Sequence, residues 1–222
     1  MKNKENTKKF EINYIITHIL RSLLIVSTIY SIYIADYLFA FGSLIATIIS
    51  FIPSIIERNY KIAIPWIFEF FIVFFLFMHT ISVQFKLYDI FLWSWAAHFA
   101  VTAFIAVLAF TIVYTFDFTK KIKLSVVMIG FFTVIFALAV GAVWEIGEFS
   151  LDQLLGTNTQ GDAFQSPLID TMVDLIFDLL AGVIVAILGM IYVEYDRKLG
   201  GIIKPFIKII KKRYKEMKEK RK

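Results

Sequence analysis

The sequence has no cysteine, few prolines and few glycines, and these shortages already narrow what the protein can be. Without cysteine, the chain has no disulfide and no thiolate metal site, while its redox compartment stays open. With four prolines and ten glycines in 222 residues, no Pro/Gly/Ser-rich linker divides the chain. We therefore expect one compact domain over residues 1–196, followed by a tail over residues 197–222.

Several common catalytic motifs are also absent. The sequence has no His-Glu-x-x-His pair, no Gly-x-Ser-x-Gly turn and no glycine-rich loop of the kind that cradles phosphates. It also lacks a Glu-x-x-His motif, which argues against the usual di-iron bundle. These absences exclude the common templates but not catalysis, so the sequence leaves open whether the protein is an enzyme.

Long apolar runs dominate what is present. Apolar residues make up 59% of the chain and aromatic residues 17%, whereas roughly 45–50% apolar content is usual for a soluble domain. Each run is close to the roughly 20 residues that a bilayer-spanning helix needs. The sequence therefore predicts an all-α, polytopic membrane protein with six spans, at about Glu11–Ala35, Tyr37–Ile56, Ile62–Ser82, Asp89–Phe116, Leu124–Phe149 and Leu168–Glu194.

The basic residues predict the orientation of these spans. They precede span one, follow spans two and four, and fill the tail, whereas the other three connections contain a single one, Lys86. By the positive-inside rule, both termini are cytoplasmic and the loops near Asp36, Lys86 and Gly156 are external. The apolar run after Lys9 is too long for a signal peptide, so we expect no cleavage there.

The tail is strongly basic, although the rest of the chain is acidic. From Arg197 onward it has twelve Lys/Arg against two acids, Glu216 and Glu219. Apolar side chains recur on one helical face over Ile203–Tyr214, which is typical of a basic amphipathic helix on the inner leaflet; a soluble basic tail is the alternative. We expect membrane lipids, and anionic lipid at the tail, as partners rather than nucleic acid. The residues expected to contact lipid headgroups are Lys204, Lys208, Lys211, Lys212 and Lys215.

Carboxylates inside the last two spans are the main functional signal. A carboxylate in hydrocarbon costs several kcal/mol unless it is paired, protonated or wetted. The acids of span five share one helix face, those of span six form a second stripe, and the single histidine of span four falls at a matching depth. These residues form the predicted polar or metal site: His98, Glu145, Glu148, Asp170, Asp174 and Asp178.

This set of groups permits more than one chemistry. Carboxylates and an imidazole suit Mg, Mn, Fe or Zn, so a divalent cation is one cofactor that the site could take. Crowded carboxylates repel one another, so either a cation or at least one extra proton should lie among them. The possible functions are a site for a cation or a lipid-linked substrate, an ion- or proton-coupled transporter, and a non-catalytic envelope protein.

A second pair of charges is predicted to be structural. Arg21 in span one and Glu69 in span three lie at similar distances from the cytoplasmic side. Either charge alone in lipid would be costly, so an ion pair between the two helices is expected; separate solvation of each is the alternative.

Short motifs between residues 89 and 182 carry a family resemblance. They are His98–Phe99, Trp144–Glu145 with Glu148, Leu155–Gly156–Thr157, Gln160–Gly161–Asp162, Asp170–Thr171 with Asp174, and Ala181–Gly182. In their order and spacing they resemble the YjdF-like bacterial inner-membrane proteins, and more faintly the VanZ-like membrane proteins. The YjdF-like resemblance implies a multi-pass protein of the bacterial plasma membrane, and it implies no established activity.

Overall fold

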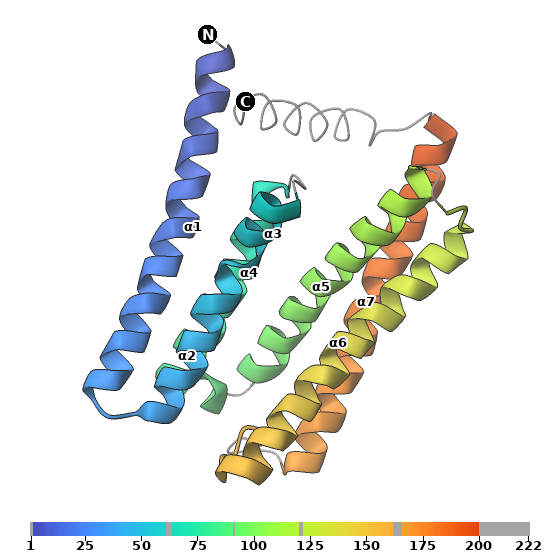
Figure 1. Cartoon of the computed structure of the whole chain (residues 1–222). Coiled ribbons are helices and arrows are strands. Elements are labelled where there is room, and N and C mark those ends of the chain that lie inside the picture. Colours follow the sequence, from blue (N-terminus) through green and yellow to red (C-terminus); the bar gives the residue numbers. More distant parts are fainter. Residues whose placement is uncertain (1, 61–63, 91, 120–121, 162–165, 200–222) are drawn as a thin grey trace. The chain divides into compact units, whose positions relative to one another are not determined.

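All regular secondary structure in the described part of the chain is helical (Figure 1). The computed structural model describes residues 2–60, 64–90, 92–119, 122–161 and 166–199. In chain order the elements are α1 (Lys2–Tyr33), α2 (Tyr37–Ser50), α3 (Ile52–Tyr60), α4 (Trp66–Gln84), the 3₁₀ helix η1 (Leu87–Asp89), α5 (Trp93–Phe118), α6 (Val126–Leu155) and α7 (Pro167–Leu199).

The predicted six-span, all-α architecture is confirmed. Six segments are long and apolar enough to cross a membrane: Tyr14–Tyr33, Tyr37–Asn59, Trp66–Gln84, Trp93–Phe118, Val126–Leu155 and Pro167–Lys198. The predicted amphipathic helix of the tail, with its five lysines, lies outside the described residues.

Two predicted spans differ from the observed helices near prolines. The second span is not one continuous helix, because α2 ends at Ser50 and α3 begins at Ile52. Pro53 has no N–H and cannot donate a helical hydrogen bond. Proline is tolerated in the first turn of a helix, because an N–H there would have no partner within the helix. The third span begins at Trp66, not at Ile62, because Pro65 has an extended backbone (ψ 131°) directly before the helix.

The helices form two compact units, divided between Phe85 and Lys86. Among the described residues, α1 to α4 make up the first unit, and η1 with α5, α6 and α7 makes up the second. A single transmembrane domain over residues 1–196 stays a prediction.

Small and hydroxyl side chains fill the interior of the first unit. Among the described residues, its buried apolar cluster consists of Leu24, Ala46 and Val73, with Leu20, Leu76 and Phe77 partly buried against it. Many buried hydroxyls bond to a carbonyl about one turn earlier on their own helix, as in Ser31 Oγ to Ser27 O (2.7 Å). These bonds satisfy the hydroxyls within one helix, and the small side chains let neighbouring helices approach closely.

The second unit is a bundle of three helices, in which α5, α6 and α7 run side by side (Figure 1). Small residues line the contact between α6 and α7. A Cβ atom added at Gly182 would already be 3.4 Å from Val134 Cα, and the Cβ of Ala137 is equally close. The α7 face with this glycine also carries Asp174 and Asp178 at four-residue spacing, so close packing brings these acids against α6.

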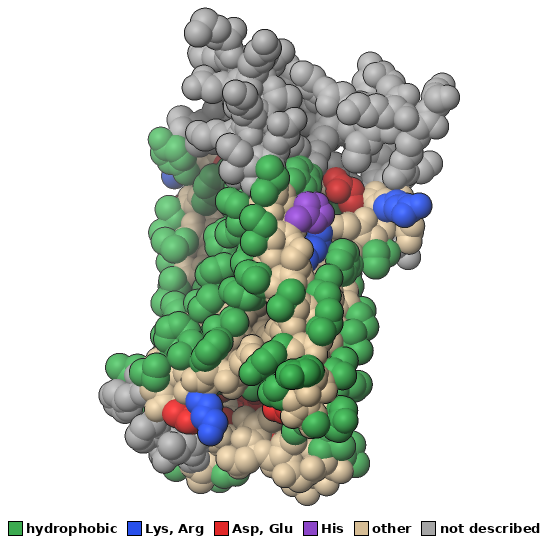
Figure 2. Space-filling view, turned by 90° about the vertical axis from the view of Figure 1, so that its left-hand side faces the viewer, with side chains coloured by type: hydrophobic (Ala, Val, Ile, Leu, Met, Phe, Trp, Pro, Cys, Tyr) green, Lys and Arg blue, Asp and Glu red, His purple; other side chains and the backbone are tan. Residues whose placement is uncertain are grey.

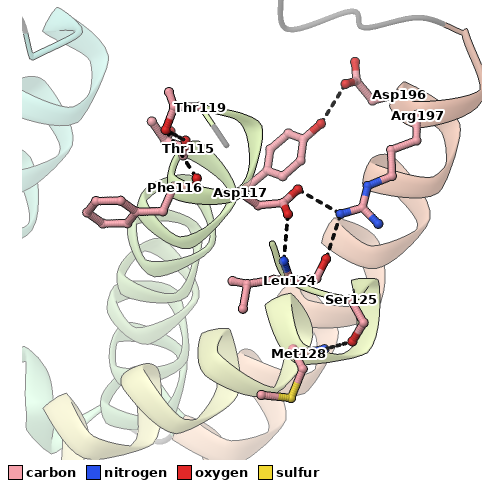
Figure 3. A network of polar contacts seen from close by, with 10 residues as sticks. Thr115, Phe116, Asp117, Thr119, Leu124, Ser125, Met128, Asp196 and Arg197 are labelled. Atoms are coloured by element: carbon pink, nitrogen blue, oxygen red, sulfur yellow. Dashed lines mark hydrogen bonds and ion pairs between the residues drawn. The ribbon is translucent and has the colours of Figure 1, made fainter. Parts of the chain in front are cut away.

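A polar network joins α5, the loop after it and α7 at one end of this unit (Figure 3). Arg197 on α7 donates to Asp117 Oδ2 (2.8 Å) and to the Leu124 carbonyl (3.0 Å), and the Leu124 N–H donates to Asp117 Oδ1 (2.9 Å). Tyr114 donates its hydroxyl proton to Asp196 Oδ2 (2.7 Å). The network therefore connects the end of α5, the loop after it and the last turns of α7.

Large apolar side chains cover the outside of the helices. Figure 2 shows one face on which hydrophobic side chains occupy most of the middle, while the charged side chains gather toward the two ends. Large apolar side chains are exposed on α1, α2, α5, α6 and α7, for example Ile29 (61%), Val127 (70%) and Leu188 (62%). In water such a surface would be an aggregation liability, whereas in a bilayer it is the lipid-facing surface.

Candidate functional site

The buried polar groups of the second unit come from all three of its long helices. His98 and Thr102 lie one turn apart on α5, Glu145 lies on α6, and Asp174 and Asp178 lie one turn apart on α7. The three acids are at most 5% exposed. Burial of three carboxylates side by side is costly, so the interactions among these groups decide what the site can do.

The His98 ring lies between two carboxylates. Its Nε2 is 2.8 Å from Asp178 Oδ1, and its Nδ1 is 3.2 Å from Asp174 Oδ2. A neutral imidazole has one N–H and one lone pair, so it can donate to only one of two carboxylates. The second contact therefore requires a further proton in the group, or a metal ion that replaces the proton on one nitrogen.

Asp178 contacts two polar side chains of α5. Its Oδ1 lies 2.8 Å from His98 Nε2 and accepts a hydrogen bond from Thr102 Oγ1 (2.5 Å). Its carboxylate also lies directly against Gly141 on α6, where an added Cβ atom would overlap it. A glycine at this position of α6 is what makes room for Asp178 in the bundle.

Glu145 and Asp174 have buried oxygens without hydrogen-bond partners. Within the described ranges, neither carboxylate oxygen of Glu145 has a hydrogen-bond partner, and Asp174 and Asp178 each have one oxygen without a partner, Oδ1 and Oδ2 respectively. One ligand atom each from His98, Glu145 and Asp174 lies within 4.8 Å of the other two. This spacing allows one metal ion to contact all three residues.

The other two predicted site residues lie near this group without belonging to it. Glu148, one turn along α6, accepts a hydrogen bond from Trp144 Nε1 (3.0 Å). Asp170, one turn before Asp174 on α7, is 6% exposed. The structure thus brings together His98, Glu145, Asp174 and Asp178, and it places Glu148 and Asp170 one turn nearer the connection between α6 and α7.

Asp152 organises that connection. Its carboxylate accepts from Thr157 Oγ1 (2.5 Å), from the N–H and hydroxyl of Thr159 (both 2.7 Å) and from the Gln160 N–H (2.9 Å). The Gln160 side chain then donates to Thr171 Oγ1 (2.8 Å) and to the Glu145 carbonyl (3.5 Å). The turn is therefore ordered by an acid on α6, and it positions a buried amide beside the backbone of Glu145.

Arg21 and Glu69 meet in the first unit. Arg21 Nη2 lies 2.9 Å from Glu69 Oε1, and the same nitrogen donates to the Ser50 carbonyl (2.5 Å) and to Ser54 Oγ (3.2 Å). Ser54 Oγ also donates to Glu69 Oε1 (2.7 Å). The pair thus lies where α2 ends and α3 begins, and it supplies a donor to a carbonyl at that break.

Two residues of the site region were not predicted from the sequence. Gly141 had no distinguishing signal, because small residues are common along membrane helices. Gln160 was noted only as part of the motif Gln160–Gly161–Asp162, because a polar connection does not indicate which of its side chains reaches a buried position. Thr102 was identifiable, because it lies one turn from His98 on the same predicted helix.

Comparisons with known proteins agree with the architecture. The model of a family described as "Predicted membrane protein (DUF2238)" matches residues 16–195, and the resemblance to YjdF-like proteins is consistent with it. Neither the curated proteins nor the solved structures contain a match.

Proposed function

The chain belongs to the DUF2238 family of predicted membrane proteins, and on this premise we propose that its second unit binds a divalent metal cation. The ligands are His98 on α5, Glu145 on α6 and Asp174 on α7. The cation would link the three helices at a buried position within the membrane-spanning part of the protein.

The state of Glu145 is the observation that carries this proposal. Its side chain is buried near Thr171, yet neither carboxylate oxygen makes a hydrogen bond of good geometry in the described part of the chain. A buried carboxylate without a partner is strongly destabilising. A cation held jointly with His98 and Asp174 would compensate that cost, and the mutual distances of at most 4.8 Å fit one ion.

The ligand types favour a first-row transition metal or zinc over magnesium and calcium. An imidazole nitrogen suits Zn²⁺ and Fe²⁺, whereas Mg²⁺ and Ca²⁺ favour oxygen ligands alone. Three protein ligands also leave at least one coordination position open, as in catalytic zinc sites, whereas structural zinc sites use four protein ligands. The open position could accept water or an oxygen of a lipid-linked substrate.

The proposal also covers the membrane in which the protein lies and its orientation there. We place the protein in the bacterial plasma membrane with both termini in the cytoplasm, because the basic residues lie almost entirely on one side of the six spans. The turn that contains Gly156 is then external. His98, Glu145 and Asp174 would lie in the half of the membrane nearer the outside.

Cation binding by the purified full chain tests the proposal. Calorimetric titration in detergent micelles with Zn²⁺, Mn²⁺ and Mg²⁺ should show saturable binding of Zn²⁺ or Mn²⁺ and much weaker binding of Mg²⁺. Glu145→Gln and Asp174→Asn should each abolish the binding while the helical content stays unchanged. Glu194→Gln, an exposed acid near the other end of α7, is the matched control and should bind as the native protein does. Absence of saturable binding, or unchanged binding by Glu145→Gln, would refute a cation site.

Contacts on both ring nitrogens of His98 support a second candidate, a proton-coupled transporter. A proton shared among His98, Asp174 and Asp178 would satisfy both contacts without a metal. In that case the native chain binds no cation but carries protons across proteoliposome membranes. Asp174→Asn should then fold normally and lose the flux and its pH dependence.

A further inference from the structure

Asp178 and Asp174 contact opposite ring nitrogens of His98. Asp178 is fully buried and lies 2.8 Å from Nε2, yet it is not among the residues whose ligand atoms are mutually within 4.8 Å. The opposite ring nitrogen, Nδ1, faces Asp174, which is in that group. The two sides of the imidazole therefore have different surroundings.

We infer, on the basis of the proposed cation site, that Asp178 is a positioning residue, which holds the Nε2–H of His98 so that Nδ1 is the atom offered to the cation. Asp178 Oδ1 accepts a hydrogen bond from the Nε2–H, and this contact determines the tautomer of the ring. A metal-bound histidine commonly donates its other N–H to a carboxylate, which fixes the ring orientation and makes the ligating nitrogen more basic.

Thr102 holds the Asp178 carboxylate in this position. Thr102 donates its hydroxyl proton to Oδ1, the same oxygen that faces His98. This bond orients the carboxylate toward the ring from the side of α5. Because Thr102 and His98 lie one turn apart on the same helix, the distance between Asp178 and the ring is set by α5 itself.

Gly141 on α6 also keeps Asp178 in place, because it has no side chain. A Cβ atom at this position would overlap the Asp178 carboxylate, with both oxygens and the carboxyl carbon within reach. A methyl group on α6 would therefore push the carboxylate away from His98 or separate the two helices. Gly147 on the same helix provides a control, because a Cβ atom there would meet nothing within 4 Å.

The consequence is a site built in two layers. Glu145 and Asp174 contact the cation together with Nδ1, while Asp178, Thr102 and Gly141 act only through the orientation of His98. Loss of an outer-layer partner typically lowers metal affinity on the order of 10- to 100-fold, whereas loss of a ligand should abolish binding.

Zn²⁺ titration of the full chain, followed by calorimetry and by ¹⁵N NMR of labelled histidine, tests this inference. The chain has three histidines, so the His98 signals are identified by their absence from His98→Gln. In the native protein, Zn²⁺ should shift Nδ1 and leave Nε2 protonated. Asp178→Asn and Gly141→Ala should weaken Zn²⁺ binding on the order of 10- to 100-fold and remove the single-tautomer pattern, whereas Gly147→Ala should change neither.

The remaining outcomes separate this inference from the proposed function. Thr102→Val removes one hydroxyl at nearly constant volume, so it gives a readout even if Asp178→Asn does not fold; it should weaken binding less than Asp178→Asn does. Zn²⁺ bound through Nε2, or native affinity in both Thr102→Val and Gly141→Ala, would overturn the positioning role and leave the cation site standing. No Zn²⁺ binding by the native chain would overturn both.

Discussion

Arg21 on α1 and Glu69 on α4 form a buried ion pair, with Arg21 Nη2 2.9 Å from Glu69 Oε1 and side-chain exposures of 4% and 7%. The guanidinium also lies over the Phe51 ring, 4.7 Å from its centroid. Because Arg21 bonds the last carbonyl of α2 as well, a single residue connects three helices of the first unit.

We expect removal of one partner to cost more than removal of both. Glu69→Leu leaves a buried guanidinium without its counter-charge, which should lower the free energy of unfolding by about 3–5 kcal/mol. The double variant Arg21→Met, Glu69→Leu should recover most of that loss, because apolar side chains of similar volume often replace a buried pair without a penalty. The measurement is reversible unfolding in mixed micelles.

A partly exposed pair provides the comparison for this experiment. Arg197, which bonds Asp117 at the end of the second unit, has a side chain 41% exposed, so Arg197→Met should cost at most about 1 kcal/mol. If Glu69→Leu cost no more than this control, the buried pair would contribute little and its structural role would be wrong.

The turn after α6 should depend on Asp152. Asp152→Ala removes four hydrogen bonds to a carboxylate, including those from the backbone N–H groups of Thr159 and Gln160. Because bonds to a charged group contribute about 1.5–3 kcal/mol each, amide hydrogen exchange at these two positions should accelerate at least about tenfold. Asp36→Ala, which removes the N-cap bond to Phe39 N at the start of α2, should leave their exchange unchanged. Unchanged exchange in Asp152→Ala would contradict the anchoring role.

Cysteine labelling tests the proposed orientation, and the native chain is already free of cysteine. A membrane-impermeant maleimide added to intact cells should modify Asn158→Cys and spare Asn59→Cys, since both side chains are exposed at loop or helix ends on opposite predicted sides. Asn59→Cys should become reactive once the membrane is permeabilised. The reverse labelling pattern would place both termini outside.

The basic tail is expected to bind the inner leaflet. Replacement of Lys204, Lys208, Lys211, Lys212 and Lys215 by Gln removes five charges, each worth about 1 kcal/mol near an anionic surface. A fluorophore at the C-terminus of the full chain should then move away from the bilayer in anionic proteoliposomes, measured as loss of energy transfer to labelled lipid. In neutral proteoliposomes the native and substituted chains should give the same signal. Equal signals in anionic membranes too would mean that the tail does not bind there through its charges.

The sequence by itself determined the architecture. Apolar runs of bilayer length predict six helices because, in lipid, every backbone polar group must bond within its own helix. The helix period also predicts which acids share a face, as for Asp174 and Asp178. A single carboxylate in hydrocarbon has a high free-energy cost, so the acids of the last two spans were expected to lie together.

Only the tertiary structure decided how the set is divided. Depth along each span predicted that Glu148 and Asp170 would join the other acids, whereas in the structure both lie one turn nearer the connection between α6 and α7, and Glu145 is the acid of α6 that lies with His98 and Asp174. The contact between Gly141 and Asp178 likewise depends on the packing of two helices. Periodicity describes one helix at a time, whereas the distances between side chains on different helices follow from helix rotation and close packing, which the sequence pattern does not encode.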